Sequence, residues 1–95
     1  MIILFVRLKS KLPEEELIAI AKERKPRFEA LPGLVQKYYV RTGEPGELGG
    51  IYVWDSRESL DEYRKSELAR TIAEAYGAIE PPRIETFEVL FPLRD

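Results

Sequence analysis

One stretch decides the fold of this chain: residues 49–63, which read GGIYVWDSRESLDEY. Positions 51–54 hold only β-branched and aromatic residues, which favour a pleated, buried strand. Tyr52 and Trp54 lie two positions apart and therefore share one face of that strand, whereas the two aliphatic residues line the other face. Both faces are apolar, so the stretch predicts a strand that needs cover on both sides.

The residues after this strand predict a helix that begins at once. Asp55 or Ser56 can cap it, because a short side-chain oxygen accepts a hydrogen bond from a free backbone N–H of the first turn. Glu58 stands three residues after Asp55, which is the spacing of a capping box. Leu60 and Tyr63 begin the apolar face of the helix. The stretch is therefore a strand-to-helix unit around which the other elements can be placed.

Hydrophobic periodicity and turn residues place the remaining elements. Pro26 removes a backbone donor and predicts a kink or an end of the first helix near Lys25. Ser66 resembles a new helix start, and Gly77 suits a helix C-cap. The predicted elements are strands at 2–8, 34–42, 49–54 and 83–91, a helix at 13–28 and a broken helix at 56–76.

This order is β-α-β-β-α-β, the ferredoxin-like arrangement of an α+β fold, and we expect one domain over residues 1–95. Both helical segments should lie on one face of an antiparallel sheet. The other face would then be bare, although the strands carry apolar residues on both faces. An exposed apolar face of that size marks an interaction surface. We therefore expect a homodimer, a dimeric α+β barrel, in which two sheets pack face to face.

Composition narrows the function classes. The net charge is -2 and the charges are interspersed, so the chain lacks the basic surface of a nucleic-acid-binding protein. It contains no cysteine and no histidine, which removes thiol nucleophiles and the commonest metal ligand and general base. The apolar N-terminal run is short and has no basic leader. Neither a signal peptide nor a membrane contact is expected, and the cytoplasm is the default location.

Two sets of side chains have both a structural and a functional interpretation. Arg7 lies on the apolar first strand, and we expect an ion pair with Glu85 or Glu88 rather than a contact with a substrate carboxylate. The chain also has 5 tyrosines. A buried tyrosine usually needs one partner for its hydroxyl, which is enough to explain each of them, but a cluster of phenols in one cavity would suit an aromatic ligand.

The segments PGL at 32–34 and GGIYVW at 49–54, with Ser59 and Tyr63, resemble the YdhR-type monooxygenase-like proteins. These form a branch of the dimeric α+β barrel group that includes the antibiotic biosynthesis monooxygenases. The resemblance implies a ligand pocket between the sheet and the helices of each subunit, with Trp54 on its wall. The haem-degrading members of the group bind haem through a histidine. This chain has none, so no cofactor, haem or metal is expected.

The resemblance implies a cofactor-independent monooxygenase that acts on a small aromatic compound, such as a phenol or a hydroquinone. The alternative is a non-catalytic dimeric protein that binds a small ligand. No catalytic residue can be named: without histidine, only Tyr, Glu, Lys or Arg-assisted ionisation remains to deprotonate a phenol. The expected substrate-binding residues are Tyr38, Tyr52, Trp54, Tyr63 and Ser66.

Overall fold

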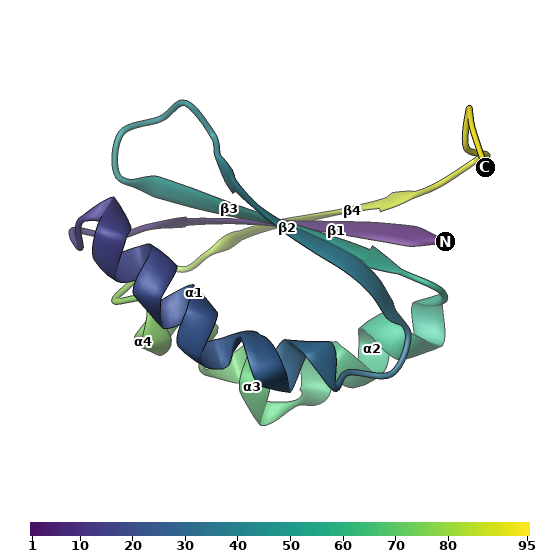
Figure 1. Cartoon of the computed structure of the whole chain (residues 1–95), viewed down its shortest axis with the longest axis horizontal. Coiled ribbons are helices and arrows are strands. Elements are labelled where there is room, and N and C mark those ends of the chain that lie inside the picture. Colours follow the sequence, from purple (N-terminus) through teal and green to yellow (C-terminus); the bar gives the residue numbers. More distant parts are fainter.

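A computed structural model describes residues 1–95 and contains the predicted elements in the predicted order (Figure 1). The chain forms four strands, one long helix and a second helical segment that is broken into three short helices. The elements are β1 (Ile2–Lys9), α1 (Glu14–Glu29), β2 (Leu34–Arg41), β3 (Glu47–Trp54), α2 (Arg57–Lys65), α3 (Glu67–Arg70), α4 (Ile72–Ala75) and β4 (Arg83–Glu88).

The strands form a single antiparallel sheet in the order β2-β3-β1-β4. All the helices lie beneath one face of this sheet, and the other face is open (Figure 1). The predicted ferredoxin-like α+β fold is therefore confirmed. None of its helices combines the length and the hydrophobicity that crossing a bilayer requires.

The covered face holds the core. Leu4 of β1 pairs with Tyr52 of β3, and Ile2 pairs with Trp54, so these four side chains point toward the helices. Trp54 and Tyr52 are 0% and 1% exposed and are the largest fully buried side chains. Phe28, Leu60, Tyr63 and Leu68 complete this cluster from the helices. The face that carries Tyr52 and Trp54 is thus the one predicted from the alternation in β3.

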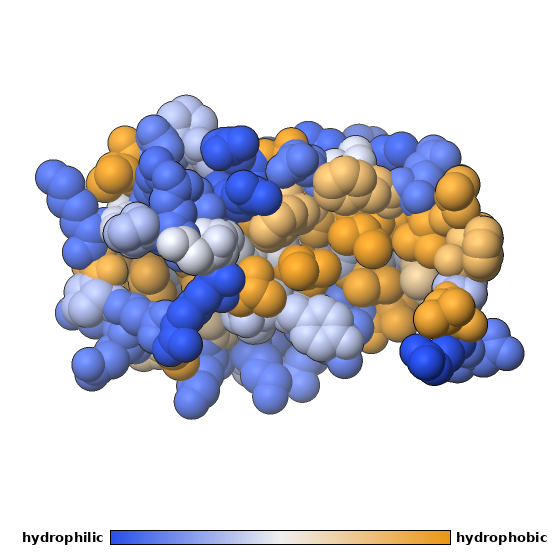
Figure 2. All heavy atoms as spheres, turned by 90° about the horizontal axis from the view of Figure 1, so that it is seen from above, coloured by the Kyte–Doolittle hydropathy of each residue, from blue (hydrophilic) through white to orange (hydrophobic).

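The open face carries the other set of alternating residues. Ile3 pairs with Val53 on one side and with Phe87 on the other, and Phe5 pairs with Ile51. These side chains are only partly covered, and Phe87 is 50% exposed. Apolar side chains gather over much of this face (Figure 2). The expected bare apolar face is therefore present in the chain.

Of the two outcomes expected at Pro26, the helix does not end near Lys25: α1 continues through Pro26 to Glu29, one residue beyond the predicted end. A proline costs the helix one hydrogen bond, and the burial of Phe28, next to the last residue of α1, offsets that loss. Of the two expected caps of α2, Ser56 is the one used: its Oγ accepts from the backbone N of Ser59 at 3.2 Å. The break at Ser66 is confirmed.

The strand ends differ slightly from the prediction. Strand β4 ends at Glu88 instead of Phe91, and β2 ends at Arg41. Residues 89–95 follow β4 outside any strand, and most of their side chains are exposed. The predicted ion pair of Arg7 is present, with its Nε 4.0 Å from Glu85 Oε1 across the β1–β4 ladder.

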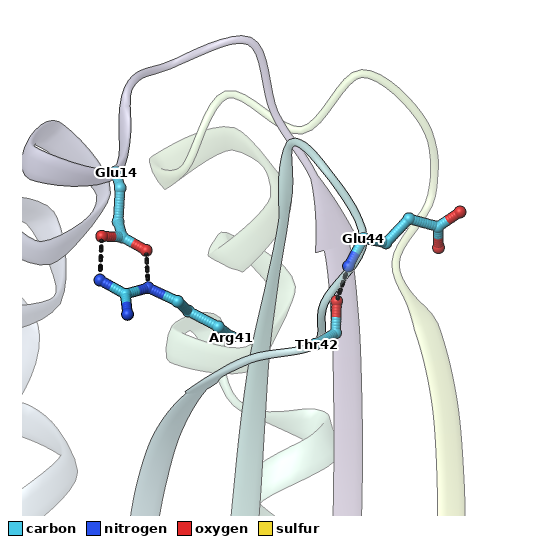
Figure 3. A network of polar contacts seen from close by, with 4 residues as sticks. All are labelled: Glu14, Arg41, Thr42 and Glu44. Atoms are coloured by element: carbon cyan, nitrogen blue, oxygen red, sulfur yellow. Dashed lines mark hydrogen bonds and ion pairs between the residues drawn. The ribbon is translucent and has the colours of Figure 1, made fainter.

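A bidentate ion pair joins the end of β2 to the start of α1 (Figure 3). Arg41 Nε donates to Glu14 Oε1 at 2.6 Å, and Nη2 donates to Oε2 at 2.8 Å. Just beyond the strand, the backbone N of Glu44 donates to Thr42 Oγ1 at 3.4 Å. These contacts connect the edge strand to the helical layer at one end of the molecule.

Candidate functional site

Lys37 lies in a cage of three aromatic rings beneath the sheet. It pairs with Tyr52 across the β2–β3 ladder, which directs its side chain toward the helices. Its Nζ lies 3.5 Å from the ring centroid of Phe28, 4.4 Å from that of Tyr52 and 4.5 Å from that of Tyr39. Lys37 belongs to none of the four ion pairs, and its Nζ makes no hydrogen bond. A half-buried amine therefore lies against aromatic rings and has no carboxylate beside it.

This environment brings Lys37 close to neutrality at ordinary pH. Burial, together with the charge of Arg24, lowers the pKa of Lys37 to about 7. The aromatic faces act in the opposite direction, because a ring quadrupole attracts the ammonium form. An amine in this position can exchange a proton near pH 7, which a lysine exposed to water does not do.

Arg24 is a buried cation without a carboxylate partner. Only 7% of its surface is exposed. Its Nη2 donates to the carbonyl oxygen of Leu68 at 3.0 Å and to Thr71 Oγ1 at 3.5 Å, whereas its buried Nε has no hydrogen-bond partner. With Lys37, it gives the space between the sheet and α1 a positive potential.

The phenols of the site remain protonated. Tyr63 Oη donates to Tyr52 Oη at 3.4 Å, and their ring centroids are 5.6 Å apart. Burial raises the pKa of Tyr52 and of Tyr63, and it raises the pKa of Tyr76 to about 12. These side chains can donate hydrogen bonds to a ligand, but they are poor proton acceptors near neutral pH.

Two spaces meet at Lys37. An inner cavity of about 20 Å³ is walled by Lys37, Tyr39, Gly50, Tyr52 and Tyr76 among others. An outer groove of about 350 Å³ runs between α1 and β2, and Lys37 and Tyr39 line this groove as well. The inner cavity has room for roughly one small molecule the size of water. The outer groove has the volume of a small-ligand site.

Gly50 contributes room to the inner cavity by having no side chain. A Cβ at this position would lie 3.1 Å from Tyr52 Cε1 and 3.7 Å from Lys37 Cε. Tyr76 has a buried Oη without a hydrogen-bond partner on the same cavity. A polar atom held there would meet both a hydroxyl and the lysine amine.

A second groove, of about 390 Å³, lies between α2 and the residues that precede β2. Trp54 forms its floor without exposing any surface, and Tyr63 and Ser66 lie along it. Ser66 Oγ donates to the carbonyl oxygen of Tyr63 and accepts from the backbone N of Ala69 at 3.2 Å. The hydroxyl of Ser66 is thus engaged in ending one helix and starting the next.

The structure brings together three of the five residues expected to bind substrate. Tyr52, Trp54 and Tyr63 form one aromatic cluster, in which the rings of Tyr52 and Trp54 are almost parallel at 8° and those of Trp54 and Tyr63 lie 5.2 Å apart. Ser66 borders this cluster from the second groove. Tyr38 lies apart from them on the open face, where it pairs with Ile51 and is 54% exposed.

A β-bulge explains the position of Tyr38. The β2–β3 register shifts between Leu34 and Gln36, so one extra residue enters β2. One residue more in a strand moves every later side chain to the opposite face. Lys37 and Tyr39 therefore point toward the helices, and Tyr38 points away from them. Its contact with a substrate stays a prediction.

Sequence reasoning did not single out Lys37, Arg24 or Phe28 as site residues. The available signal for Lys37 was its position two residues before Tyr39 in a β-prone run. Residues two positions apart in a strand lie on the same face. Arg24 and Phe28 stand at helical spacing on the buried stripe of α1. A charged residue on an apolar stripe is a signal for a polar interior site.

No group of three or more acidic, histidine or cysteine side chains is placed to hold a metal ion. The site described above is built instead from aromatic rings, hydroxyls and two cations.

The family model described as "Putative mono-oxygenase ydhR" matches residues 3–94. No curated protein matches the chain. Among solved structures, a protein of unknown function from Nitrosomonas europaea is 23% identical, with a TM-score of 0.80 over 96% of this chain and 90% of the other. SnoaB, a cofactor-independent oxygenase from Streptomyces nogalater, is 16% identical, with a TM-score of 0.77 over 99% of this chain and 97% of the other.

A protein from Deinococcus radiodurans described as a "putative antibiotic biosynthesis monooxygenase" is 12% identical, with a TM-score of 0.78 over 100% of this chain and 98% of the other. At identities this low, the likeness to solved structures concerns the fold.

Proposed function

Because this chain belongs to the ydhR mono-oxygenase family, we propose that it is a cofactor-independent monooxygenase that acts on a small phenol or hydroquinone-like compound. The observation that carries the proposal is the aromatic-walled space around the unpaired amine of Lys37. Aromatic walls suit a flat aromatic ligand, and an amine that exchanges protons near neutral pH supplies the base that phenol oxidation needs.

The reaction needs no bound redox group, because an ionised phenol can itself supply electrons to oxygen. In the overall conversion, a phenol and dioxygen give a quinone and water. One oxygen atom becomes the new carbonyl and the other leaves as water, while the ring supplies the four electrons. What the protein contributes is a dry pocket, an oriented ring and a proton acceptor.

The outer groove is the proposed substrate site. Its volume of about 350 Å³ accommodates one aromatic ring with substituents, and Phe28, Lys37 and Tyr39 line it. The inner cavity of about 20 Å³ shares Lys37 and Tyr39 with this groove and is large enough only for a small molecule such as water or dioxygen.

We also propose that the protein is a homodimer formed through the open face of the sheet. Ile3, Phe5, Ile51, Val53 and Phe87 give this face an apolar centre without helical cover. Two such sheets packed face to face would bury these side chains, and the exposed Phe87 in particular would lose its contact with water.

Oxygen consumption tests the proposed activity. The wild-type protein is mixed with a panel of phenols and hydroquinones, and uptake is followed with an oxygen electrode while product quinones are recorded by absorbance. We expect uptake with at least one small substrate, one water formed per oxygen consumed and little hydrogen peroxide. Ligand binding is measured in parallel by thermal shift.

Two tyrosine variants locate the site. Tyr52→Phe removes a hydroxyl beneath the sheet and is expected to lower kcat, whereas Tyr38→Phe removes one on the open face and is the matched control. Trp54→Phe is expected to keep the fold and to weaken the binding of aromatic ligands. Binding without oxygen uptake would instead support the ligand-binding alternative, and neither binding nor uptake would refute both functions.

A further inference from the structure

We infer that Lys37 is the proton acceptor of this site and that the substrate is held as a phenolate beside it. The inference rests on the proposed function for the class of substrate. It adds the catalytic base and the charge state of the bound ligand, neither of which the sequence indicated.

Lys37 borders both spaces that a substrate and a small molecule would occupy. Lys37 lines both the outer groove and the inner cavity. Its Nζ has neither a carboxylate within ion-pair distance nor a hydrogen-bond acceptor. A phenol hydroxyl in the groove would therefore meet an amine whose lone pair or N–H bonds are not already engaged.

The balance of charge favours an anionic ligand. Arg24 of α1 is 7% exposed, and its buried Nε has no partner. From α1, Lys25 and Glu29 face the outer groove, but Glu29 forms no ion pair with Lys37 or Arg24. From the sheet and the other helices, the ionisable groups nearby are phenols. Neither Arg24 nor Lys37 has a carboxylate partner in the protein. For Lys37, which lines the groove, a phenolate would supply the counter-ion.

The neighbouring hydroxyls are unsuited to the same task. Burial raises the pKa of Tyr39, Tyr52 and Tyr63, and it raises the pKa of Tyr76 to about 12. Burial and Arg24 lower the pKa of Lys37 to about 7. A proton acceptor works best when its pKa lies near the working pH, so among these groups Lys37 is the base and the tyrosines are donors.

The step is a proton transfer and involves no redox change. The O–H bond of the substrate breaks, an N–H bond forms on Nζ, and the neutral pair becomes an ammonium and a phenolate. The three rings that surround Nζ stabilise the ammonium through cation–π attraction, since all three centroids lie within 4.5 Å. The cage thus favours the protonated amine that the transfer produces.

Nuclear magnetic resonance tests the base without any reaction. Protein labelled with ¹³C at lysine Cε is titrated from about pH 5 to about pH 11, a range that includes both a lowered lysine pKa and the ordinary one. We expect one Cε resonance, absent in Lys37→Met, to titrate near pH 7. Lys22→Met, at an exposed position of α1, is the matched control and should retain this resonance. If no resonance that is absent in Lys37→Met titrates near pH 7, the inference is wrong.

A chromogenic phenol tests the ionised ligand. The probe is 4-nitrophenol, whose neutral and phenolate forms absorb at different wavelengths. Wild-type protein should bind it and increase the phenolate band at a pH where free 4-nitrophenol is mostly neutral. Lys37→Met should bind phenolate about 10- to 100-fold more weakly, as expected when a charge-assisted contact is lost. Lys22→Met should match the wild type, and circular dichroism checks the fold of both variants.

The outcomes separate this inference from the proposed function. A Lys37 resonance near pH 7 and a phenolate band without oxygen uptake would support the base and reject the monooxygenase. Oxygen uptake that Lys37→Met retains in full, with the same pH profile as the wild type, would reject the base and leave the monooxygenase in place. A phenolate band of equal size in Lys37→Met would also overturn the inference.

Discussion

The two faces of the sheet are built from the same strands and are both apolar, yet they have different chemistry. The face beneath the helices carries Tyr52 and Lys37, whose polar atoms meet a hydroxyl and aromatic rings, and Trp54, whose buried Nε1 has no hydrogen-bond partner. The open face carries Ile51 and Val53 at its centre, with no polar group between them. Helices leave irregular spaces beside a sheet, where large amphipathic side chains find partners, whereas a bare face presents a smooth apolar surface. The difference indicates one face for chemistry and one for association.

The largest expected effect comes from removing a large buried side chain from the covered face. Trp54→Ala removes a side chain that is 0% exposed, and we expect a loss of about 3–5 kcal/mol in the free energy of unfolding, measured by urea denaturation. Val53→Ala, one position earlier and on the open face, should cost about 1 kcal/mol at low protein concentration. Equal losses would remove the distinction between the two faces.

The next effect concerns association. Ile51→Lys places a charge at the centre of the open face, and burying that charge between two sheets should weaken the dimer by about 100-fold or more. Sedimentation equilibrium measures the dissociation constant. Ile18→Lys, on the exposed side of α1, is the matched control and should leave the dimer unchanged. A wild-type protein that remains monomeric at micromolar concentration would contradict the proposed dimer.

A smaller effect should appear as a pH dependence that belongs to the covered face. The folded state lowers the pKa of Lys37 to about 7, below the value of about 10.4 in an unfolded chain. Between these values the unfolded state binds more protons, so stability should rise with pH, by at most about 1.4 kcal/mol per unit. Below pH 7, Lys37 is protonated in both the folded and the unfolded state. The free-energy cost of burying its charge then no longer changes with pH.

Comparison with Lys37→Met isolates the contribution of Lys37 to the pH dependence of stability. The difference in unfolding free energy between the wild type and the variant should move in favour of the wild type by about 2 kcal/mol between pH 7 and pH 9. Urea denaturation at several pH values measures this difference in unfolding free energy. Lys22→Met is the control for its change with pH. A flat difference would mean that Lys37 is as well solvated as a surface lysine.

The smallest effect should come from the edge of the helical layer. Arg41 and Glu14 form a short bidentate pair, but both side chains are well exposed (Figure 3). Exposed pairs add little stability, so Arg41→Gln should leave the unfolding midpoint almost unchanged. The hydrogen bond to Arg41 lowers the pKa of Glu14, and the variant should return that pKa to its ordinary range, which NMR can follow.

The elements that could be predicted from the sequence are those with local causes. Period-two alternation at 51–54 indicated which side chains share a face, and Ser66 marked a new helix start because its side chain can bond its own first turn. The likeness at residues 32–34 and 49–54 led to the family. These signals depend on neighbours along the chain, so a single sequence contains them.

The environment of Lys37 could not be predicted in this way. It depends on the bulge between Leu34 and Gln36, which moves Lys37 to the covered face, and on the ring of Phe28, which reaches it from α1. The bulge has no distinctive residue in this sequence, so Tyr38 was expected where Tyr39 lies. A lysine on an edge strand is ordinarily solvated, and only tertiary packing encloses this one.

An uncharged amine is also a nucleophile. At neutral pH, burial and the charge of Arg24 leave part of the Lys37 population without a proton, whereas a lysine in water is almost entirely charged. Acylating and carbamoylating reagents, and aldehydes that form imines, react with the uncharged form. The same feature that suits Lys37 to accept a proton therefore makes it the preferred point of covalent attachment, so an electrophile small enough for the outer groove would label this lysine before any other.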